Sequence, residues 1–237
     1  FHDKSGRVMV ATPTMMEQLR IHGFRNTALW SRGVDVELFH PSKRGIDGGL
    51  FKDLPKPVFA YVGRVSVEKN IEAFLKLDLP GSKVVVGGGP ALEELKQKYP
   101  AALFPGPKFG EELARHYADA DVFVFPSFTD TFGLVILEAM ATGTPVAGFI
   151  APGPQDIIPG SNAGAINEDL KRAALEALNC DRSVTRAYAE RFSWRACAEE
   201  FRRNLEPLPK PEKKRFWRRL ADARARARER RRIAREQ

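Results

Sequence analysis

Short apolar runs alternate with helical patterns along this chain from Pro57 onward. The runs with the composition of buried strands span residues 57–63, 83–89, 121–127 and 144–149, and helix-like stretches lie near residues 69–77, 90–98, 110–118 and 133–142. Continuous apolar strands separated by helices are typical of a parallel sheet that is covered on both faces. We therefore predict an α/β fold with a doubly wound parallel sheet, and a ligand beyond the carboxyl ends of its strands.

The segments before and after these alternating strands and helices predict an incomplete α/β unit, a linker and a tail. Residues 7–30 read as strand, helix and strand, the edge of another α/β unit, and residues 36–56 contain prolines and glycines typical of a linker. Helical stretches near residues 167–179, 183–191 and 194–206 follow the last strand, before a proline cluster. With 237 residues, we expect one full domain with attached pieces. The predicted parts are residues 1–40, 41–56, 57–208 and 209–237.

The positive charge of the chain is concentrated at its end. Residues 210–237 contain 13 Lys and Arg residues and four acidic residues, whereas the whole chain has a net charge of +8. The rest of the chain is therefore close to neutral and is not a general binder of polyanions.

Cysteine content and hydropathy limit the cellular context. Cys180 and Cys197 are too few for a disulfide framework, and no thiol spacing suggests zinc, which favours a reducing compartment. No apolar run approaches the length of a membrane-spanning helix. The chain begins at Phe1 without the features of a signal peptide. We expect a fragment of a cytoplasmic protein.

The strongest local signal for a ligand site lies at residues 128–147. Asp130 precedes a Phe-Gly step that opens a helix, and Glu138 follows eight positions later. Gly133 lets the backbone approach a ligand closely, and the free N–H groups of a first helical turn bind phosphate. The alternative is that Asp130 only caps the helix and Glu138 is a partly buried acid with a backbone partner.

Two further signals follow predicted strands. In residues 61–70, YVGRVSVEKN, Arg64 and Lys69 stand where a strand ends, and two cations at that edge can clamp a diphosphate. The alternative is a solvated loop with surface charges. Residues 87–90, GGGP, fit close approach to a ligand or a plain turn from strand to helix, and they lack the spacing of a dinucleotide motif.

These motifs occur in one order at one edge of the predicted sheet, and together they resemble the donor-binding half of a family 4 (group 1) retaining glycosyltransferase with the GT-B fold. The matching residues are GVD at 33–35, LFHP at 38–41, GRVSVEKN at 63–70, GGGP at 87–90, ADADVFVFPS at 118–127, DTFGLVILEAMATGTPVA at 130–147, APGPQDII at 151–158 and RAYAERFSW at 186–194. The resemblance extends from Arg7 to about Leu208. It implies that residues 57–208 are a Rossmann-like domain that binds a nucleotide-sugar, and that residues 1–40 are the remnant of an acceptor domain.

The resemblance also implies roles for individual residues. In that family the first acid of an E-x7-E motif contacts the transferred sugar and the second holds the ribose hydroxyls; Asp130 and Glu138 occupy these positions, and Asp130 is one methylene shorter than the family's Glu. Arg64 and Lys69 match the basic pair on the donor diphosphate. The implied catalytic residues are therefore Arg64, Lys69 and Asp130.

The remaining implied contacts are with the donor itself. Gly63, Phe132, Gly133, Leu134 and Glu138 match positions that bind the nucleotide-sugar, and the base pocket is expected near residues 106–109. The resemblance implies a metal-independent reaction without a cofactor. The chain's four histidines, His2, His22, His40 and His116, fall in no recognisable catalytic motif, and we interpret them as structural or exposed.

The resemblance leads to a hexosyltransferase that moves a sugar, with retention, from a nucleotide-sugar to a lipid or glycan. The TDTFGLV and APGPQDII motifs are similar to those of bacterial and plant glycolipid glycosyltransferases. This similarity favours a UDP-linked donor, with GDP-linked donors as the alternative. Because most of the acceptor domain is missing from the chain, we expect it to bind the donor and to transfer poorly. The alternatives are a truncated nucleotide-sugar-binding module without activity and a sugar-nucleotide epimerase.

The tail predicts a basic helix. Residues 212–237 are rich in Ala and Arg, and Phe216, Trp217 and Leu220 share a narrow apolar face. Such a helix suits an anionic membrane surface, which makes peripheral attachment to the inner face of the membrane through residues 210–237 an expectation. A solvated charged tail is the alternative, and nucleic acid is a less favoured partner.

Overall fold

The computed structural model describes residues 5–207 together with Ala223 and Arg226. The chain divides into one unit of residues 1–204 and a second of residues 205–237. The predicted basic tail, residues 209–237, lies outside the described residues apart from Ala223 and Arg226, and so does His2. Among the described residues, none of the helices combines the length and apolar character needed to cross a membrane.

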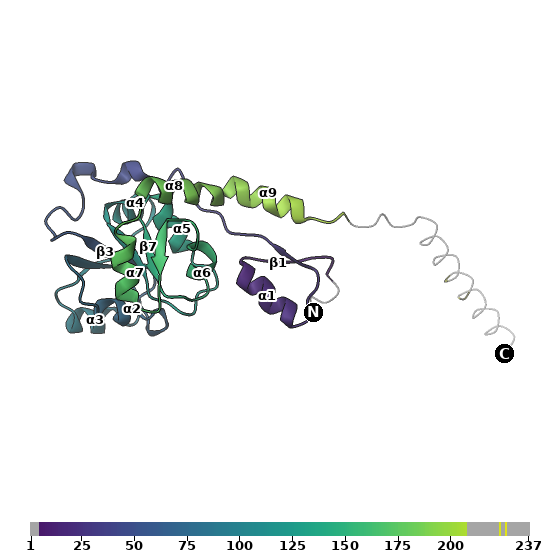
Figure 1. The fold of residues 1–237 in the computed structure, drawn as a ribbon, viewed down its shortest axis with the longest axis horizontal. Helices are drawn as coiled ribbons and strands as arrows, with labels where there is room; N and C mark the ends of the chain where they lie inside the picture. Colours follow the sequence, from purple (N-terminus) through teal and green to yellow (C-terminus); the bar gives the residue numbers. More distant parts are fainter. Residues whose placement is uncertain (1–4, 208–222, 224–225, 227–237) are drawn as a thin grey trace. The chain divides into compact units, whose positions relative to one another are not determined.

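A six-stranded parallel sheet forms the centre of the first unit (Figure 1). Its strands are β3 (Val58–Val62), β4 (Ser82–Val86), β5 (Leu103–Gly106), β6 (Val122–Phe125), β7 (Val146–Gly148) and β8 (Gly164–Ile166), in the spatial order β5-β4-β3-β6-β7-β8. The strand order reverses direction between β3 and β6. In open α/β sheets a ligand binds at such a switch point, outside the carboxyl ends of the strands.

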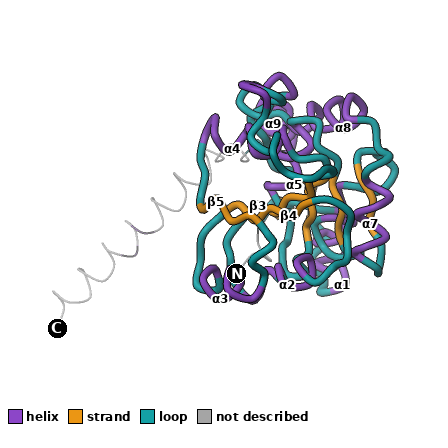
Figure 2. The backbone as a smooth tube through the Cα atoms, turned by 90° about the vertical axis from the view of Figure 1, so that its left-hand side faces the viewer, coloured by secondary structure: helices purple, strands orange, loops and turns teal. Residues whose placement is uncertain are grey.

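Helices cover both faces of the sheet (Figure 2). The helices around the sheet are α2 (Ile71–Leu75), α3 (Leu92–Lys98), α4 (Gly110–Asp119), α5 (Leu134–Ala141), α6 (Pro154–Ile157), α7 (Leu170–Ala177) and α8 (Arg182–Ala189). A further helix, α9 (Trp194–Asn204), packs against residues 29–31 instead of the sheet. Short 3-10 turns lie at Pro41–Lys43, Ile46–Gly48, Val67–Lys69 and Glu190–Phe192. The doubly wound α/β fold predicted from the sequence is confirmed.

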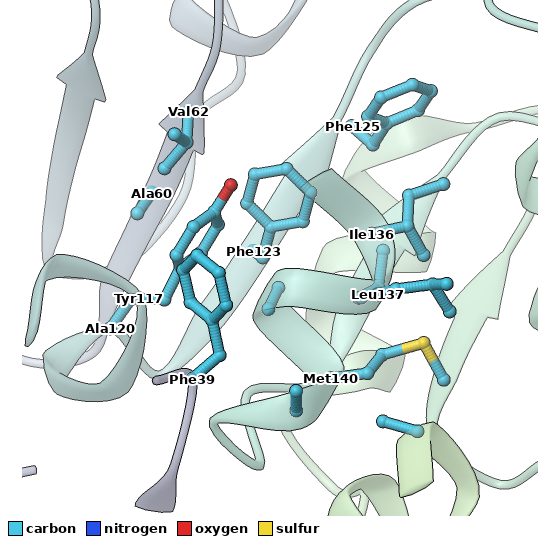
Figure 3. Packing of buried hydrophobic residues seen from close by; sticks show 14 of the residues in the cluster. Phe39, Ala60, Val62, Tyr117, Ala120, Phe123, Phe125, Ile136, Leu137 and Met140 are labelled. Carbon is cyan, nitrogen blue, oxygen red and sulfur yellow. The ribbon is translucent and has the colours of Figure 1, made fainter. Parts of the chain in front are cut away.

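Alternate residues of β3 enter two separate hydrophobic clusters, one on each face of the sheet. Val58, Ala60 and Val62 pack with α4, α5 and α8, whereas Phe59 and Tyr61 pack with α2, α3 and α7. Figure 3 shows the first cluster, in which the side chains of α5 lie against those of β6. Every residue of β3 is buried, which explains its continuous apolar sequence.

A smaller α/β piece precedes the sheet. Strands β1 (Val8–Val10) and β2 (Thr27–Leu29) pair in parallel, and α1 (Pro13–Ile21) connects them. This confirms the strand, helix and strand predicted for residues 7–30. The Thr12 side chain caps α1 by accepting a hydrogen bond from the Met15 N–H, with Pro13 in the first turn.

The helix predicted at residues 69–77 is shorter and begins later than expected. A 3-10 turn over Val67–Lys69 comes first, and α2 starts at Ile71. Asn70 lies between them in a left-handed conformation with a φ of 54°, which interrupts the helical hydrogen bonds. Strands β5 and β8 and helix α6 were not predicted from the sequence.

The histidines in the described chain have structural surroundings. The His40 ring accepts a hydrogen bond from the Ser42 N–H at the start of a 3-10 turn, and His22 is exposed. His116 is buried beside Phe51, and burial lowers its pKa. The thiols of Cys180 and Cys197 are both free.

Candidate active site

Two neighbouring cavities lie at the switch point of the sheet. The first, the charged cavity, has a volume of about 450 Å³ and is lined by Arg64, Lys69 and Asp130 among others. The second, the apolar cavity, has a volume of about 380 Å³ and contains Glu138. Val62, Gly63, Arg64 and Val135 line both cavities, so the two adjoin.

The end of β3 places Arg64 between the two cavities. The Gly63 N–H bonds to the Val86 carbonyl of β4 at 3.0 Å, and the Tyr61 hydroxyl donates to the Arg64 carbonyl at 2.9 Å. A Cβ atom on Gly63 would lie 2.8 Å from the Tyr61 hydroxyl oxygen, so this packing requires glycine. The backbone of Arg64 is thus fixed, while its guanidinium is exposed and makes no hydrogen bond or ion pair within the described chain.

Lys69 and Asp130 form an ion pair in the charged cavity. The Lys69 Nζ lies 2.7 Å from Oδ1 of Asp130, and both side chains are about three-quarters buried. Oδ2 of Asp130 is buried and has no hydrogen-bond partner among the described residues. Next to Lys69, the Asn70 amide donates to the carbonyl of Pro126 after β6 at 3.1 Å. This bond joins the loops that follow β3 and β6.

The loop before α5 forms a wall of the charged cavity. Gly133 has a φ of 82° at the start of the helix, and its added Cβ would lie 2.9 Å from Ile136. Phe132 is buried and Leu134 is exposed, and all three residues line the cavity. The N-terminus of α5 therefore opens toward the same cavity as Arg64 and Lys69.

Glu138 is held by a buried tyrosine. The Tyr117 hydroxyl donates to Oε2 of Glu138 at 2.8 Å, and the Tyr117 ring packs edge-on against Phe39 and Phe123 (Figure 3). Burial raises the pKa of the Glu138 carboxyl above its ordinary value, and the hydrogen bond from Tyr117 partly opposes this rise. Glu138 therefore faces the apolar cavity from an otherwise apolar helix.

The glycines of the GGGP motif have a packing role. A Cβ on Gly87 would lie 1.9 Å from the Gly63 carbonyl, and one on Gly89 would lie 2.3 Å from the Val65 carbonyl. The loops after β3 and β4 can approach this closely only because these residues lack side chains. Gly88 is not crowded in this way and lines the apolar cavity.

The residues expected at the base pocket also reach the apolar cavity. Pro107, Lys108 and Phe109 line it, and the Phe109 ring is 79% exposed. All eight residues proposed from the sequence thus line one of two adjoining cavities: Gly63, Arg64, Lys69, Asp130, Phe132, Gly133, Leu134 and Glu138.

The charged cavity has further polar lining residues that were not proposed from the sequence, including Thr131. Arg32 and Ser127 both line it. Ser127 ends the run that was interpreted as a strand, whereas Arg32 lies far upstream, directly before the GVD motif. Its position next to this motif was the feature of the sequence that could have indicated a role for Arg32 in the site.

A third cavity, of about 410 Å³, shares Phe132 with the charged cavity. It is lined by the start of α1, by Asp156 of α6 and by Arg191, Glu200 and Arg203. Among the residues that the structure describes, no group of three or more His, Cys, Asp or Glu side chains is arranged to hold a metal ion.

The chain matches known sequences across the part that builds these cavities. The family model of group 1 glycosyl transferases matches residues 56–180. A GDP-mannose-dependent alpha-mannosyltransferase of Corynebacterium glutamicum is 37% identical over 163 residues, covering 66% of this chain and 39% of the relative. Sulfoquinovosyl transferase SQD2 of Arabidopsis thaliana is 33% identical over 219 residues, covering 82% of this chain and 41% of the relative. The chain therefore spans less than half the length of these two relatives.

Solved structures share the fold. Sucrose-phosphate synthase from Thermosynechococcus elongatus superposes with a TM-score of 0.71 at 27% identity, covering 93% of this chain and 60% of that chain. Anabaena Alr3699/HepE, solved with UDP and glucose, has a TM-score of 0.70 at 19% identity, covering 85% of this chain and 64% of that chain. The family resemblance predicted from the sequence is confirmed, and the chain belongs to the group 1 glycosyl transferases.

Proposed function

We propose that this chain is the donor-binding part of a retaining hexosyltransferase that moves a sugar from a nucleotide-sugar to a lipid or glycan acceptor. One observation carries the proposal: two adjoining cavities at the switch point of the sheet share Arg64, with Glu138 in one and the Lys69 and Asp130 pair in the other. An elongated ligand with a nucleoside end, a central diphosphate and a sugar end fits this order.

The apolar cavity accommodates the nucleoside. The base packs near Phe109 and Gly88, and the Glu138 carboxylate accepts hydrogen bonds from the ribose hydroxyls. A ribose has adjacent hydroxyl donors, whereas a carboxylate is an acceptor when it is ionised. Tyr117 holds one carboxylate oxygen, which fixes the orientation of the group before the ligand arrives.

Arg64 binds the diphosphate where the two cavities meet. As the bond between the sugar and the diphosphate breaks, negative charge grows on the leaving nucleotide, and the Arg64 guanidinium and the N–H groups at the start of α5 stabilise it. Lys69 adds a second cation. These groups supply the charge stabilisation in a reaction that we propose to be metal-independent and without a cofactor.

Asp130 contacts the transferred sugar. Its Oδ2 is buried without a partner in the charged cavity, which is a costly arrangement unless a ligand donates a hydrogen bond to it. A sugar hydroxyl supplies such a donor. The aspartate is shorter than the family's glutamate, so the distance to the sugar differs in this chain and sugar selectivity is expected to differ with it.

The acceptor is proposed to approach through the third cavity. This cavity adjoins the sugar end through Phe132 and includes the buried, unpartnered Oδ2 of Asp156. One matched relative is named for GDP-mannose, and one solved structure of the same fold contains UDP, so UDP- and GDP-linked donors are both tested. Attachment to an anionic membrane through residues 210–237 stays a prediction, which co-sedimentation with anionic and neutral vesicles tests.

Ligand-induced thermal shifts test the donor site. We expect one of the UDP-, GDP- and ADP-sugars to raise the melting temperature of the 237-residue chain, because a ligand that binds only the folded state stabilises it. Lys69→Ala and Glu138→Gln should lose most of that shift, whereas Glu94→Gln, an exposed substitution on α3, should retain it. Full shifts in both site variants would place the ligand elsewhere.

The alternative functions predict different products. An epimerase converts the nucleotide-sugar without an acceptor, whereas a glycosyltransferase releases nucleoside diphosphate only as it transfers sugar to an acceptor or to water. Donor binding without any transfer to a glycolipid acceptor would favour a binding module.

A further inference from the structure

We propose that Arg32 is a third donor-binding cation, whose guanidinium binds the diphosphate together with Arg64. The proposal rests on the proposed donor site. Arg32 lines the charged cavity together with Arg64, Lys69 and Asp130, although it lies between β2 and β3 rather than at the carboxyl end of a strand of the sheet. No motif assigned from the sequence includes it.

The residue before Arg32 is anchored to α9. The Ser31 N–H and hydroxyl both bond to Oε2 of Glu200, at 2.6 Å and 2.9 Å, and the Cys197 thiol lies 3.3 Å from the Ser31 carbonyl. A charged acceptor makes these bonds stronger than neutral ones. The backbone entering Arg32 is therefore held in place before any ligand binds.

The residues after Arg32 are anchored to the turn before α9. A Cβ on Gly33 would lie 2.5 Å from the Trp194 ring, so the two are in direct contact. The Val34 N–H then bonds to the Phe192 carbonyl at 2.8 Å, and Val34 forms a parallel bridge with Ser193. Arg32 is thus fixed from both sides, as a preorganised binding group should be.

The Arg32 side chain is oriented by an aromatic ring. Its guanidinium carbon lies 5.1 Å from the centre of the Trp30 ring, and that ring in turn packs at 4.8 Å against Phe201. An arginine attracted to an aromatic face can still donate hydrogen bonds from its N–H groups. Within the described chain, no hydrogen bond or ion pair engages those N–H groups. A half-buried arginine with free donors is suited to a phosphate.

The charge balance of the cavity favours a diphosphate as the ligand. Lys69 is already paired with Asp130, whereas neither Arg64 nor Arg32 forms an ion pair with a described residue. A nucleotide-sugar carries about two negative charges on its diphosphate, and each is a good partner for a guanidinium. Arg64 and Arg32 together match the two charges of the diphosphate, whereas Arg64 alone matches one.

Calorimetric titration of the 237-residue chain tests this assignment. The probes are the nucleoside diphosphate that gives the largest thermal shift with the wild-type chain and the corresponding nucleoside, which lacks phosphate. Arg32→Gln keeps much of the stem but removes the charge, and Arg32→Lys keeps the charge but not the fork. The matched control is Arg25→Gln, an exposed arginine of the N-terminal piece that lines neither cavity.

We expect Arg32→Gln to lower the affinity for the nucleoside diphosphate by about ten- to a hundredfold, which is the effect of losing a charge-assisted hydrogen bond. Arg32→Lys should fall between this variant and the wild type. The nucleoside should bind all variants equally, and Arg25→Gln should bind both probes like the wild type. Urea unfolding of each variant establishes that the fold is retained.

Two results overturn the proposal while leaving the proposed function intact. One is an Arg32→Gln variant that binds the nucleoside diphosphate as tightly as the wild type does. The other is an equal loss for nucleoside and nucleoside diphosphate, which would mean that the substitution distorts the site rather than removing a phosphate contact. A wild-type chain that binds no nucleoside diphosphate or nucleotide-sugar overturns the proposed function itself.

Discussion

The Tyr117 hydroxyl donates a 2.8 Å hydrogen bond to the carboxylate of Glu138 at the wall of the apolar cavity. Both groups are removed from water: Tyr117 is fully buried, and burial raises the pKa of Glu138. A carboxyl group in this setting costs free energy when it ionises. Its presence on a helix that is otherwise apolar therefore calls for a role in binding rather than in stability.

This cost makes the stability of the chain depend on pH through Glu138. In the unfolded chain Glu138 titrates near its ordinary pKa of 4.5, and in the folded chain it titrates at a higher pH. Between the two values the folded state binds more protons, so the free energy of unfolding falls as the pH rises through this window. Glu138→Gln should remove that fall, and its stability relative to the wild type should increase with pH from 4.5 upward.

Urea unfolding at pH 4.5 and at about pH 7 measures this difference. The control is Glu94→Gln, whose exposed side chain should leave the pH dependence unchanged. If the stability of Glu138→Gln relative to the wild type does not increase with pH, the buried, ionising carboxyl is contradicted. The same variant should bind nucleotide poorly, so it separates stability from function.

The ion pair between Lys69 and Asp130 predicts that its loss changes the affinities of two ligands by different amounts. Asp130→Asn removes the negative charge beside Lys69 and frees its ammonium for phosphate. A nucleoside diphosphate, which has no sugar to contact Asp130, should then bind roughly three- to tenfold more tightly, the range of a partly exposed ion pair. The matching nucleotide-sugar should gain less, because it loses its hydrogen bond to Oδ2.

Calorimetry with both ligands on one protein preparation gives the ratio of their dissociation constants. Asp53→Asn makes the same change of charge at an exposed site outside the two cavities and should leave that ratio unchanged. If Asp130→Asn lowers the affinity for the nucleoside diphosphate, Lys69 depends on Asp130 for its position, and the prediction that the substitution frees its ammonium for phosphate is wrong.

The sequence predicted the inner strands of the sheet and the position of the site better than the edge strands. The inner strands β3, β4 and β6 are continuous apolar runs, and these were identified. The edge strands β5 and β8 are short, and β5 contains Pro105 and Gly106, which are tolerated at an edge but carry little strand signal. The position of the site followed from topology, because all parallel strands present their carboxyl ends at one edge.

The contacts inside the site could not be predicted in the same way. Lys69 and Asp130 are 61 positions apart, and whether they meet depends on the left-handed turn at Asn70 and on its bond to Pro126. Arg32 reaches the cavity only because its neighbours are attached to α9, more than 150 positions later. Such contacts arise from tertiary packing, and neither composition nor periodicity records them.

A half-buried arginine at the opposite edge of the sheet, Arg182, predicts a measurable loss of stability. The Arg182 guanidinium donates to the carbonyls of Ala118 and Ala120 at 2.9 Å, and it also reaches the Thr144 hydroxyl. Burial and the nearby Arg44 lower the pKa of Arg182 to about 10. Arg44 donates to the same two carbonyls, so Arg182→Met should cost about 1–3 kcal/mol, the loss of its own hydrogen bonds rather than of every donor to these acceptors.

The measurement is the free energy of urea unfolding, with Arg172→Met as the control. Arg172 is an exposed residue of α7 paired with Glu176, and its loss should cost less than about 0.5 kcal/mol. Since Arg182 is remote from both cavities of the candidate site, the Arg182→Met protein that remains folded should bind nucleotide with unchanged affinity. A weaker affinity at full folding would show that this edge communicates with the site.

The contact between Gly33 and Trp194 predicts a substitution whose effect a second substitution relieves. Gly33→Ala places a Cβ 2.5 Å from the Trp194 ring and should destabilise the fold by about 1–3 kcal/mol. It should also displace Arg32 and weaken nucleoside diphosphate binding. The Trp194 side chain is 59% exposed, so Trp194→Ala should cost less than a core truncation. The double variant should recover part of both properties, because the Trp194 Cα, 2.9 Å from the added Cβ, remains. Unfolding and titration of the two single variants and the double variant form a thermodynamic cycle. If stability recovers in the double variant but affinity does not, the segment around Gly33 supports the fold without positioning Arg32.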